Sequence, residues 1–119
     1  MKNDNILQQK SYSFAIRVVK AFQFLVIEKK EYVLSKQFLR SGTSIGANVE
    51  EAIGGQTDKD FYAKLNIVYK EARETHYWIR LLKDTDYFDD TQAISLIIDC
   101  EEILKITGSI IKTLKNRNS

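Results

Sequence analysis

The clearest periodic signal in the sequence is FYAKLNIVYKEARETHYWIRLL, from Phe61 to Leu82. Apolar or small side chains recur there at alternating intervals of four and three residues, at Phe61, Leu65, Val68, Ala72, Thr75, Ile79 and Leu82. This spacing marks one face of an α-helix, and its persistence over three heptads is typical of helices that pack nearly parallel to their neighbours. The stretch therefore predicts a long amphipathic helix, from about residue 58 to residue 83.

Three further segments show helical spacing, and none shows the strict alternation of a half-buried strand. They run from about Asn5 to Lys29, from Leu34 to Ile53 and from Gln92 to Leu114. The first has its apolar line at Leu7, Phe14, Val18 and Leu25. In the last, the line is Ala93, Ile97, Cys100, Leu104, Thr107, Ile111 and Leu114, broadened by Leu96, Ile103 and Ile110. Short links between four such helices predict an all-α, antiparallel, up-down-up-down four-helix bundle.

The middle of the second segment is unusually rich in small residues. Six of the seven positions 41–47 are Ser, Gly, Thr or Ala. Interior glycine costs a helix about 1 kcal/mol relative to alanine, so this composition needs a reason. One interpretation is close approach of another helix. The alternative is a helix break at Gly42, with Thr43 or Ser44 capping a new start.

Turn signals separate the segments. Gly54 and Gly55 are expected to end the second helix, since glycine readily adopts the left-handed conformation found past helix ends. Thr57, followed three residues later by Asp60, resembles a capping box for the third helix. The last helix can be capped by Asp89, Asp90 or Thr91.

The composition fits a single globular domain over residues 1–119. The chain has no proline and only five glycines, which disfavours β-sandwiches and barrels. No apolar run approaches the roughly 20 residues of a membrane span, and the N-terminal residues lack the apolar core of a signal peptide. With a single cysteine, Cys100, no intrachain disulfide can form, and we expect a cytoplasmic location.

Catalytic and metal-binding patterns are missing from the sequence. A di-metal carboxylate bundle needs repeated Glu-x-x-His motifs, but the one histidine, His76, lies three residues after Arg73. A zinc site is poorly supported by one cysteine and one histidine. Cys100 lies on an apolar line, and the carboxylates Glu50, Glu51, Glu71 and Glu74 are expected to form solvated or bridging ion pairs. We therefore expect no enzyme activity, no cofactor, no metal and no small-molecule substrate.

A second line of the third segment alternates aromatic and basic groups: Tyr62, Asn66, Tyr69, Arg73, His76, Arg80 and Lys83. Three interpretations remain open. The line can contact nucleic acid, with Arg and Lys on phosphates and Tyr stacked on bases. It can form a subunit interface, where Tyr and Arg are enriched. It can also be the ordinary flank of an amphipathic helix.

Two stretches carry a family resemblance. QFLRSGTSIGANVEEA, residues 37–52, and DFYAKLNIVYKEARETHYWIRLLKDTDYF, residues 60–88, resemble the four-helix-bundle proteins encoded in 23S rRNA intervening sequences. That family includes the accessory proteins of diversity-generating retroelements. The matching positions are Gln37, Arg40, Ser41, Ser44, Ile45, Asn48, Glu51, Phe61, Leu65, Glu71, Ala72, Glu74, Thr75 and Trp78.

The resemblance implies a second helix that is continuous through its glycines, a ring-like homopentamer and no enzymatic activity. It also implies association of the retroelement branch with reverse transcriptase and nucleic acid. Those accessory proteins are strongly basic, whereas this chain has a formal net charge of +2.

From the residues and the resemblance together, we expect a non-catalytic oligomeric scaffold or adaptor that associates with RNA or a nucleic-acid enzyme. The alternative is a protein–protein interaction module with no nucleic-acid binding. The candidate nucleic-acid contacts are Arg17, Arg40, Arg73, Arg80 and Lys83. We also expect the polar residues Asn48, Thr75 and Thr107 to form hydrogen bonds between helices and to fix their register.

Overall fold

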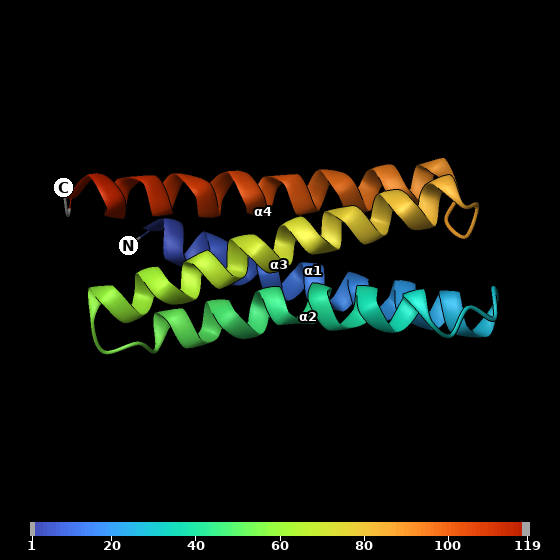
Figure 1. Ribbon diagram of the computed structural model, residues 1–119, viewed down its shortest axis with the longest axis horizontal. Coiled ribbons are helices and arrows are strands. Elements are labelled where there is room, and N and C mark those ends of the chain that lie inside the picture. Colours follow the sequence, from blue (N-terminus) through green and yellow to red (C-terminus); the bar gives the residue numbers. More distant parts are fainter. Residues whose placement is uncertain (1, 118–119) are drawn as a thin grey trace.

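The computed structural model describes residues 2–117, and the side chains of residues 4–117. It consists of four helices, α1 (Lys2–Ile27), α2 (Leu34–Ile53), α3 (Asp58–Asp84) and α4 (Asp90–Arg117). Consecutive helices run antiparallel in an elongated bundle of 47 × 21 × 21 Å (Figure 1). The predicted all-α up-down-up-down bundle is confirmed. α1 begins three residues earlier than expected, and α4 begins two residues earlier and ends three residues later.

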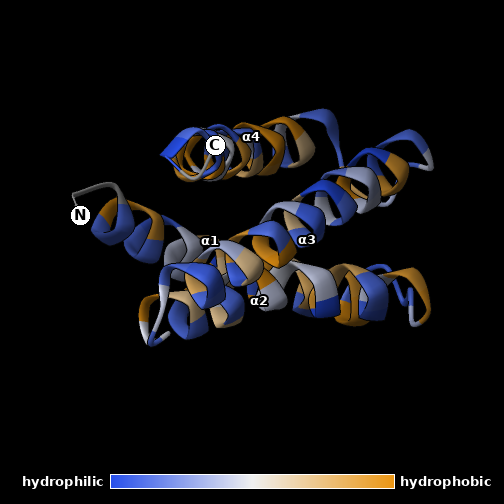
Figure 2. Cartoon of the chain, turned by 60° about the vertical axis from the view of Figure 1, so that its left-hand side comes forward, coloured by the Kyte–Doolittle hydropathy of each residue, from blue (hydrophilic) through white to orange (hydrophobic). Residues whose placement is uncertain are grey.

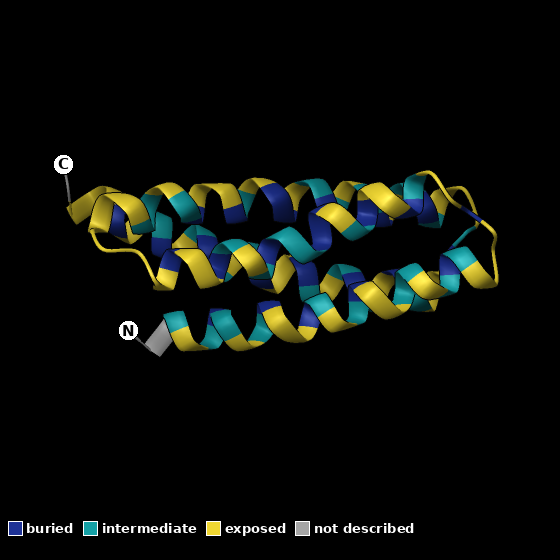
Figure 3. Ribbon diagram, turned by 90° about the horizontal axis from the view of Figure 1, so that it is seen from below, coloured by how far each residue is buried: buried dark blue, intermediate teal, exposed yellow. Residues whose placement is uncertain are grey.

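Each helix packs against two neighbours, so that the contacts run α1–α2, α2–α3, α3–α4 and α4–α1. The core lies along the centre and is made by one face of each helix (Figure 3). The predicted lines of α1 and α3 are buried, apart from Phe61, which is half-buried at the start of α3. No helix within residues 2–117 is both long and apolar enough to cross a membrane.

One detail of the predicted core is wrong, and it lies in α4. In α4 the predicted positions Ala93, Cys100, Thr107 and Leu114 are buried, but they are joined by Leu96, Ile103 and Ile110, whereas Ile97, Leu104 and Ile111 are half-buried. The observed line therefore follows intervals of three and four residues from Ala93, which rotates α4 slightly from the expected orientation. In α2, Val49 occupies the core and Asn48 is half-buried beside it.

The small residues of α2 are explained by α1. The helix is continuous from Leu34 to Ile53, so a break at Gly42 is ruled out. A Cβ atom placed on Gly42 would lie only 2.6 Å from a methyl carbon of Val18, and one placed on Gly46 would lie 3.3 Å from the backbone oxygen of Ser11. Glycine at these positions lets the two backbones approach closely.

The helix ends confirm the predicted caps but not the predicted glycine conformation. The Thr57 hydroxyl accepts a hydrogen bond from the Asp60 backbone N–H at 3.0 Å. Asp89 accepts from the Gln92 N–H at 2.7 Å, and Gln92 accepts in return from the Asp89 N–H. Gly54, however, has φ −79°, which is right-handed. The left-handed positions in the described chain belong to Lys30, with φ 54°, and Asp86, with φ 69°.

The link between α1 and α2 is organised by one buried carboxylate. Glu31 accepts hydrogen bonds from the backbone N–H groups of Val33 at 3.1 Å and Ser35 at 2.6 Å. Burial alone would raise the pKa of Glu31, but these hydrogen bonds stabilise the charged form and lower its pKa below the usual 4.5. The carboxylate therefore acts as the N-terminal cap of α2, for which Val33 supplies no side-chain bond.

Candidate functional site

The five predicted basic residues do not form one patch. Arg17 lies at the α1–α4 seam, Arg40 at the α2–α3 seam, and Arg73 and Arg80 at the α3–α4 seam. Lys83, near the end of α3, pairs with the adjacent Asp84 at 3.6 Å. The predicted nucleic-acid contacts therefore lie on three sides of the bundle. The neighbours of each basic side chain determine whether it can reach a phosphate.

Arg40 is neutralised by two carboxylates of α3. One of its terminal nitrogens contacts both oxygens of Glu74 at 2.8 Å, and the other lies 3.3 Å from Glu71. The hydrogen bond to Glu74 raises the pKa of Arg40, and the charge of Glu71 adds to this effect. Glu71 is buried, so of the two expected kinds of ion pair, solvated and bridging, it forms the bridging kind between α3 and α2. Because the guanidinium is fixed by these acids, it is poorly placed to contact phosphates.

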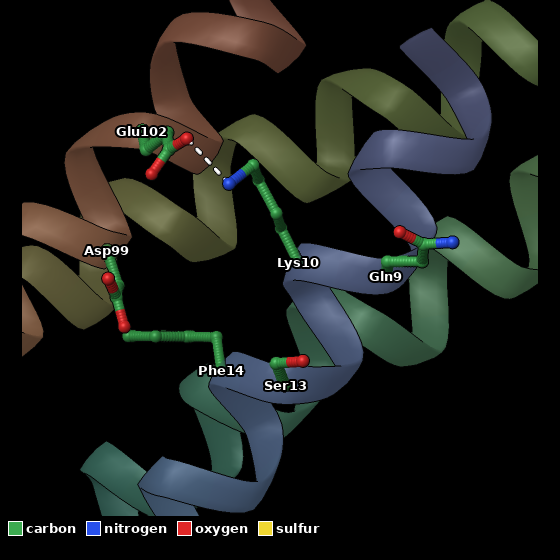
Figure 4. Close-up of a pocket in the computed structure, with 6 residues that line it drawn as sticks. All are labelled: Gln9, Lys10, Ser13, Phe14, Asp99 and Glu102. Atoms are coloured by element: carbon green, nitrogen blue, oxygen red, sulfur yellow. Dashed lines mark ion pairs between the residues drawn. The ribbon is translucent and has the colours of Figure 1, made fainter. Parts of the chain in front are cut away.

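Arg17 is also held by acidic and polar groups, in this case from α4. It donates to the Ser95 hydroxyl at 2.8 Å and is paired with Asp99. Two turns earlier, Lys10 pairs with Glu102 at 2.6 Å across the same seam. Figure 4 shows Lys10 reaching from α1 to Glu102, on one side of a groove of about 290 Å³ above Phe14. These pairs close the seam, so the groove does not present free cations.

Arg73 and Arg80 differ from Arg17 and Arg40, because neither contacts a carboxylate in the described chain. The Nε of Arg80 donates to Nδ1 of His76 at 3.1 Å, and Nε2 of His76 lies 3.3 Å from Glu101 on α4. Tyr69 and Leu104 complete a notch of about 270 Å³ at this seam. The alternating aromatic and basic residues predicted along α3, from Tyr62 to Lys83, thus face the side of α4 over part of that line.

The catalytic candidates of the sequence have structural roles. Cys100 is fully buried, and its thiol donates to the backbone oxygen of Ala72 at 3.2 Å. Burial raises the pKa of Cys100 to about 12, and the charges of Glu101 and Asp99 contribute further. A nucleophilic thiolate is disfavoured by this setting. Within residues 2–117, no group of three or more His, Cys, Asp or Glu side chains is arranged to hold a metal ion.

The expectation about buried polar residues is met in one of three cases. Thr75 donates to the Ser41 hydroxyl at 2.9 Å, which joins α3 to α2 inside the core. Asn48 instead bonds to the Ser44 oxygen of its own helix at 2.8 Å, so it makes no link to a neighbour. The buried hydroxyl of Thr107 has no hydrogen-bond partner among the described residues. Only Thr75 therefore acts as an interhelical register contact.

An apolar surface on α1 was missed by the sequence analysis. Tyr12, Ile16 and Val19 lie one turn apart on the outward face and are 66%, 44% and 38% exposed. On α4, Ile94 and Ile98 are similarly exposed. Figure 2 shows hydrophobic and hydrophilic residues interspersed along each helix. The signal was available, because Tyr12, Ile16 and Val19 follow one another at intervals of four and three residues, outside the line of Leu7, Phe14, Val18 and Leu25.

Comparison with known proteins places the fold in a family. A family model described as 23S rRNA-intervening sequence protein matches residues 3–109. A solved structure from Bacteroides thetaiotaomicron VPI-5482, described as a protein with unknown function from the S23 ribosomal protein family, is 53% identical with a TM-score of 0.91. That match covers 92% of this chain and 98% of the other. No curated protein matches. The chain belongs to the 23S rRNA-intervening sequence protein family.

Proposed function

We propose that the protein is a non-catalytic scaffold or adaptor that acts by assembling with copies of itself and with a protein partner. The observation that carries this proposal is the apolar stripe of Tyr12, Ile16 and Val19 on the outer face of α1. Contiguous exposed apolar surface on a bundle whose core is already filled is typical of an interaction site. The resemblance to a family of ring-like oligomers points in the same direction.

The charge distribution supports a protein partner over nucleic acid as the main target. Three of the five predicted phosphate contacts, Arg17, Arg40 and Lys83, are paired with acids of the same chain. Nucleic-acid binding depends on cations that can exchange counterions for phosphates. Cations already neutralised within the protein contribute little to such binding.

Native mass determination, by light scattering at high micromolar concentration, tests the assembly. We expect an oligomer for the wild-type protein and a shift towards monomer for Ile16→Glu, because the new charge would be desolvated in the contact. Ile98→Glu is the matched control, since Ile98 is an exposed isoleucine on α4. A strictly monomeric wild-type protein would overturn the proposal, and dissociation by Ile98→Glu alone would move the interface to α4.

Association with RNA is the second candidate, and it depends on Arg73 and Arg80, which lack acidic partners in the described chain. In an assembly, repeated weak contacts can bind a polyanion that one copy does not hold. Retention on immobilised RNA should then fall steeply between low and physiological salt. Negligible retention at both salt concentrations would remove this candidate.

A further inference from the structure

The notch between α3 and α4 gathers three basic side chains, Arg73, His76 and Arg80. Its lining consists of Tyr69, Arg73, His76, Arg80, Glu101 and Leu104, and its volume is about 270 Å³. The four residues from α3 follow the spacing 4,3,4, so they lie on one side of that helix. The notch is thus a small hollow with basic groups along one wall and the flank of α4 along the other.

Arg80 is fixed in position by its neighbours. Its Nε donates to Nδ1 of His76, and its guanidinium carbon lies 5.9 Å from the centre of the Tyr77 ring. Because Nδ1 acts as an acceptor, the imidazole carries its proton on Nε2, which is 3.3 Å from Glu101. This relay orients Arg80 while its two terminal nitrogens have no partner within residues 2–117.

Arg73 lies on the same line, two helical turns before Arg80, a rise of about 10 Å along the axis. It has no hydrogen bond or ion pair with the described residues. The two guanidinium groups therefore border one hollow with unused donors. Arg17 and Arg40, by contrast, are held by Asp99 and Glu74.

We propose that this notch binds phosphoryl oxygens, with Arg80 as the oriented donor and Arg73 as the second contact. A guanidinium presents paired N–H groups that match the geometry of phosphate oxygens. Glu101 is the one carboxylate in the lining, and it is engaged by His76. The site needs no macromolecular partner, so it goes beyond the proposed scaffold function and does not depend on it.

The single histidine of the chain provides a direct probe of the site. Untagged, full-length protein is titrated with inorganic pyrophosphate at constant ionic strength and about pH 8, where an ordinary imidazole is neutral. The imidazole NMR signals of His76 are recorded, and circular dichroism checks the fold of every variant. We expect a saturable shift. Arg80→Ala should weaken binding about ten-fold or more, and Arg73→Ala several-fold, because each loses charge-assisted hydrogen bonds.

Lys70→Ala is the matched control, because Lys70 is an exposed cation of α3 outside the lining. It should change the affinity less than about two-fold, since Lys70 does not line the notch and its exposed charge is partly screened at physiological salt. A shift that does not saturate, or an equal loss for Lys70→Ala and Arg80→Ala, would overturn the proposal.

A single-stranded RNA oligonucleotide distinguishes the two sources of phosphate. Competition between the oligonucleotide and pyrophosphate for the His76 signal would support the site and extend it to nucleic-acid phosphates. Binding of the oligonucleotide without any effect of pyrophosphate, and with equal losses for all three variants, would overturn it in favour of diffuse electrostatic attraction. The native mass, measured in the same samples, reports separately on the scaffold proposal.

Discussion

Helix α1 meets its two neighbours in opposite ways. Against α2 the backbones approach so closely that a Cβ atom on Gly42 would lie 2.6 Å from Val18. Against α4 the packing is less extensive than at the other three seams, and the ion pairs Lys10–Glu102 and Arg17–Asp99 span a groove of about 290 Å³. The first seam is formed by small residues and the second by long charged ones.

This difference shows where the stability of the bundle resides. Close packing gains dispersion and burial along the whole length of a seam, whereas exposed ion pairs typically contribute less than about 1 kcal/mol. The helices joined by a short link are packed more extensively, and the α1–α4 seam, which no link closes, is spanned by ion pairs at its surface. We therefore expect the α1–α4 seam to open first.

The largest effect on stability is expected at the closely packed α1–α2 seam. Gly42→Ala should lower the free energy of unfolding by about 2 kcal/mol, because overpacking of up to roughly 3 kcal/mol exceeds the gain of about 1 kcal/mol in helix propensity. Urea denaturation measures this change. An increase in stability would show that the α1–α2 seam has room to adjust.

A double-mutant cycle sharpens that prediction. Val18→Ala alone should destabilise the protein by leaving a cavity beside Gly42. Combined with Gly42→Ala, the new methyl group would fill part of that cavity, so the double variant should be more stable than the sum of the single effects by about 1 kcal/mol. Additive effects would contradict a direct contact between these two positions.

Two buried threonines, Thr75 on α3 and Thr107 on α4, allow the effect of a hydroxyl group to be compared between the two helices. Thr75→Val should cost about 1.5 kcal/mol, because it removes the hydrogen bond that crosses to Ser41. Thr107→Val should be neutral or stabilising, since that hydroxyl is buried without a partner among the described residues. Equal effects in chemical denaturation would refute a register role for Thr75.

The cap of α2 predicts a pH dependence. The folded pKa of Glu31 is below its unfolded value near 4.5, so its stabilising effect is complete above that value and is lost as the pH falls through the folded pKa. Glu31→Gln should cost about 1 kcal/mol at neutral pH and flatten the loss of stability in acid. Thermal denaturation between about pH 3 and pH 7 measures this, with the exposed Glu28→Gln as control. Identical slopes for wild type and Glu31→Gln would disprove the cap.

The smallest effect on stability is expected at the α1–α4 seam. Arg17→Met should change stability by less than about 1 kcal/mol, and the difference should shrink at high salt. Hydrogen exchange should nevertheless show faster local opening of α1 and α4 than of α2. If the amide hydrogens of α2 exchange before those of α1 and α4, the α1–α4 seam does not open first.

Most of the fold could be predicted from the sequence, because amphipathic spacing reports directly on burial. The line from Phe61 to Leu82 located α3, and the glycines of α2 already indicated close approach as one explanation. The error in α4 has a physical origin. Its apolar residues form a band wider than one line, and the spacing alone does not determine which edge of that band faces the core.

The candidate site was less predictable, because a side chain's partners depend on distant residues. Nothing local to Arg17 indicates that Asp99, 82 positions later, will neutralise it. The same applies to Arg40, whose acidic partners lie on the next helix. Residue type identified the cations, but only the packing of the helices distinguishes those that are already paired from Arg73 and Arg80.

Two residues with a left-handed backbone conformation mark positions where the stability of the bundle could be increased. Lys30 and Asp86 hold backbone conformations that cost an ordinary residue roughly 1–2 kcal/mol, while the five glycines of the chain are placed elsewhere. Gly42 and Gly46 lie where α2 packs closely on α1, whereas non-glycine residues hold the two left-handed link positions. Replacing exposed Lys30 or Asp86 with glycine should accordingly raise heat tolerance.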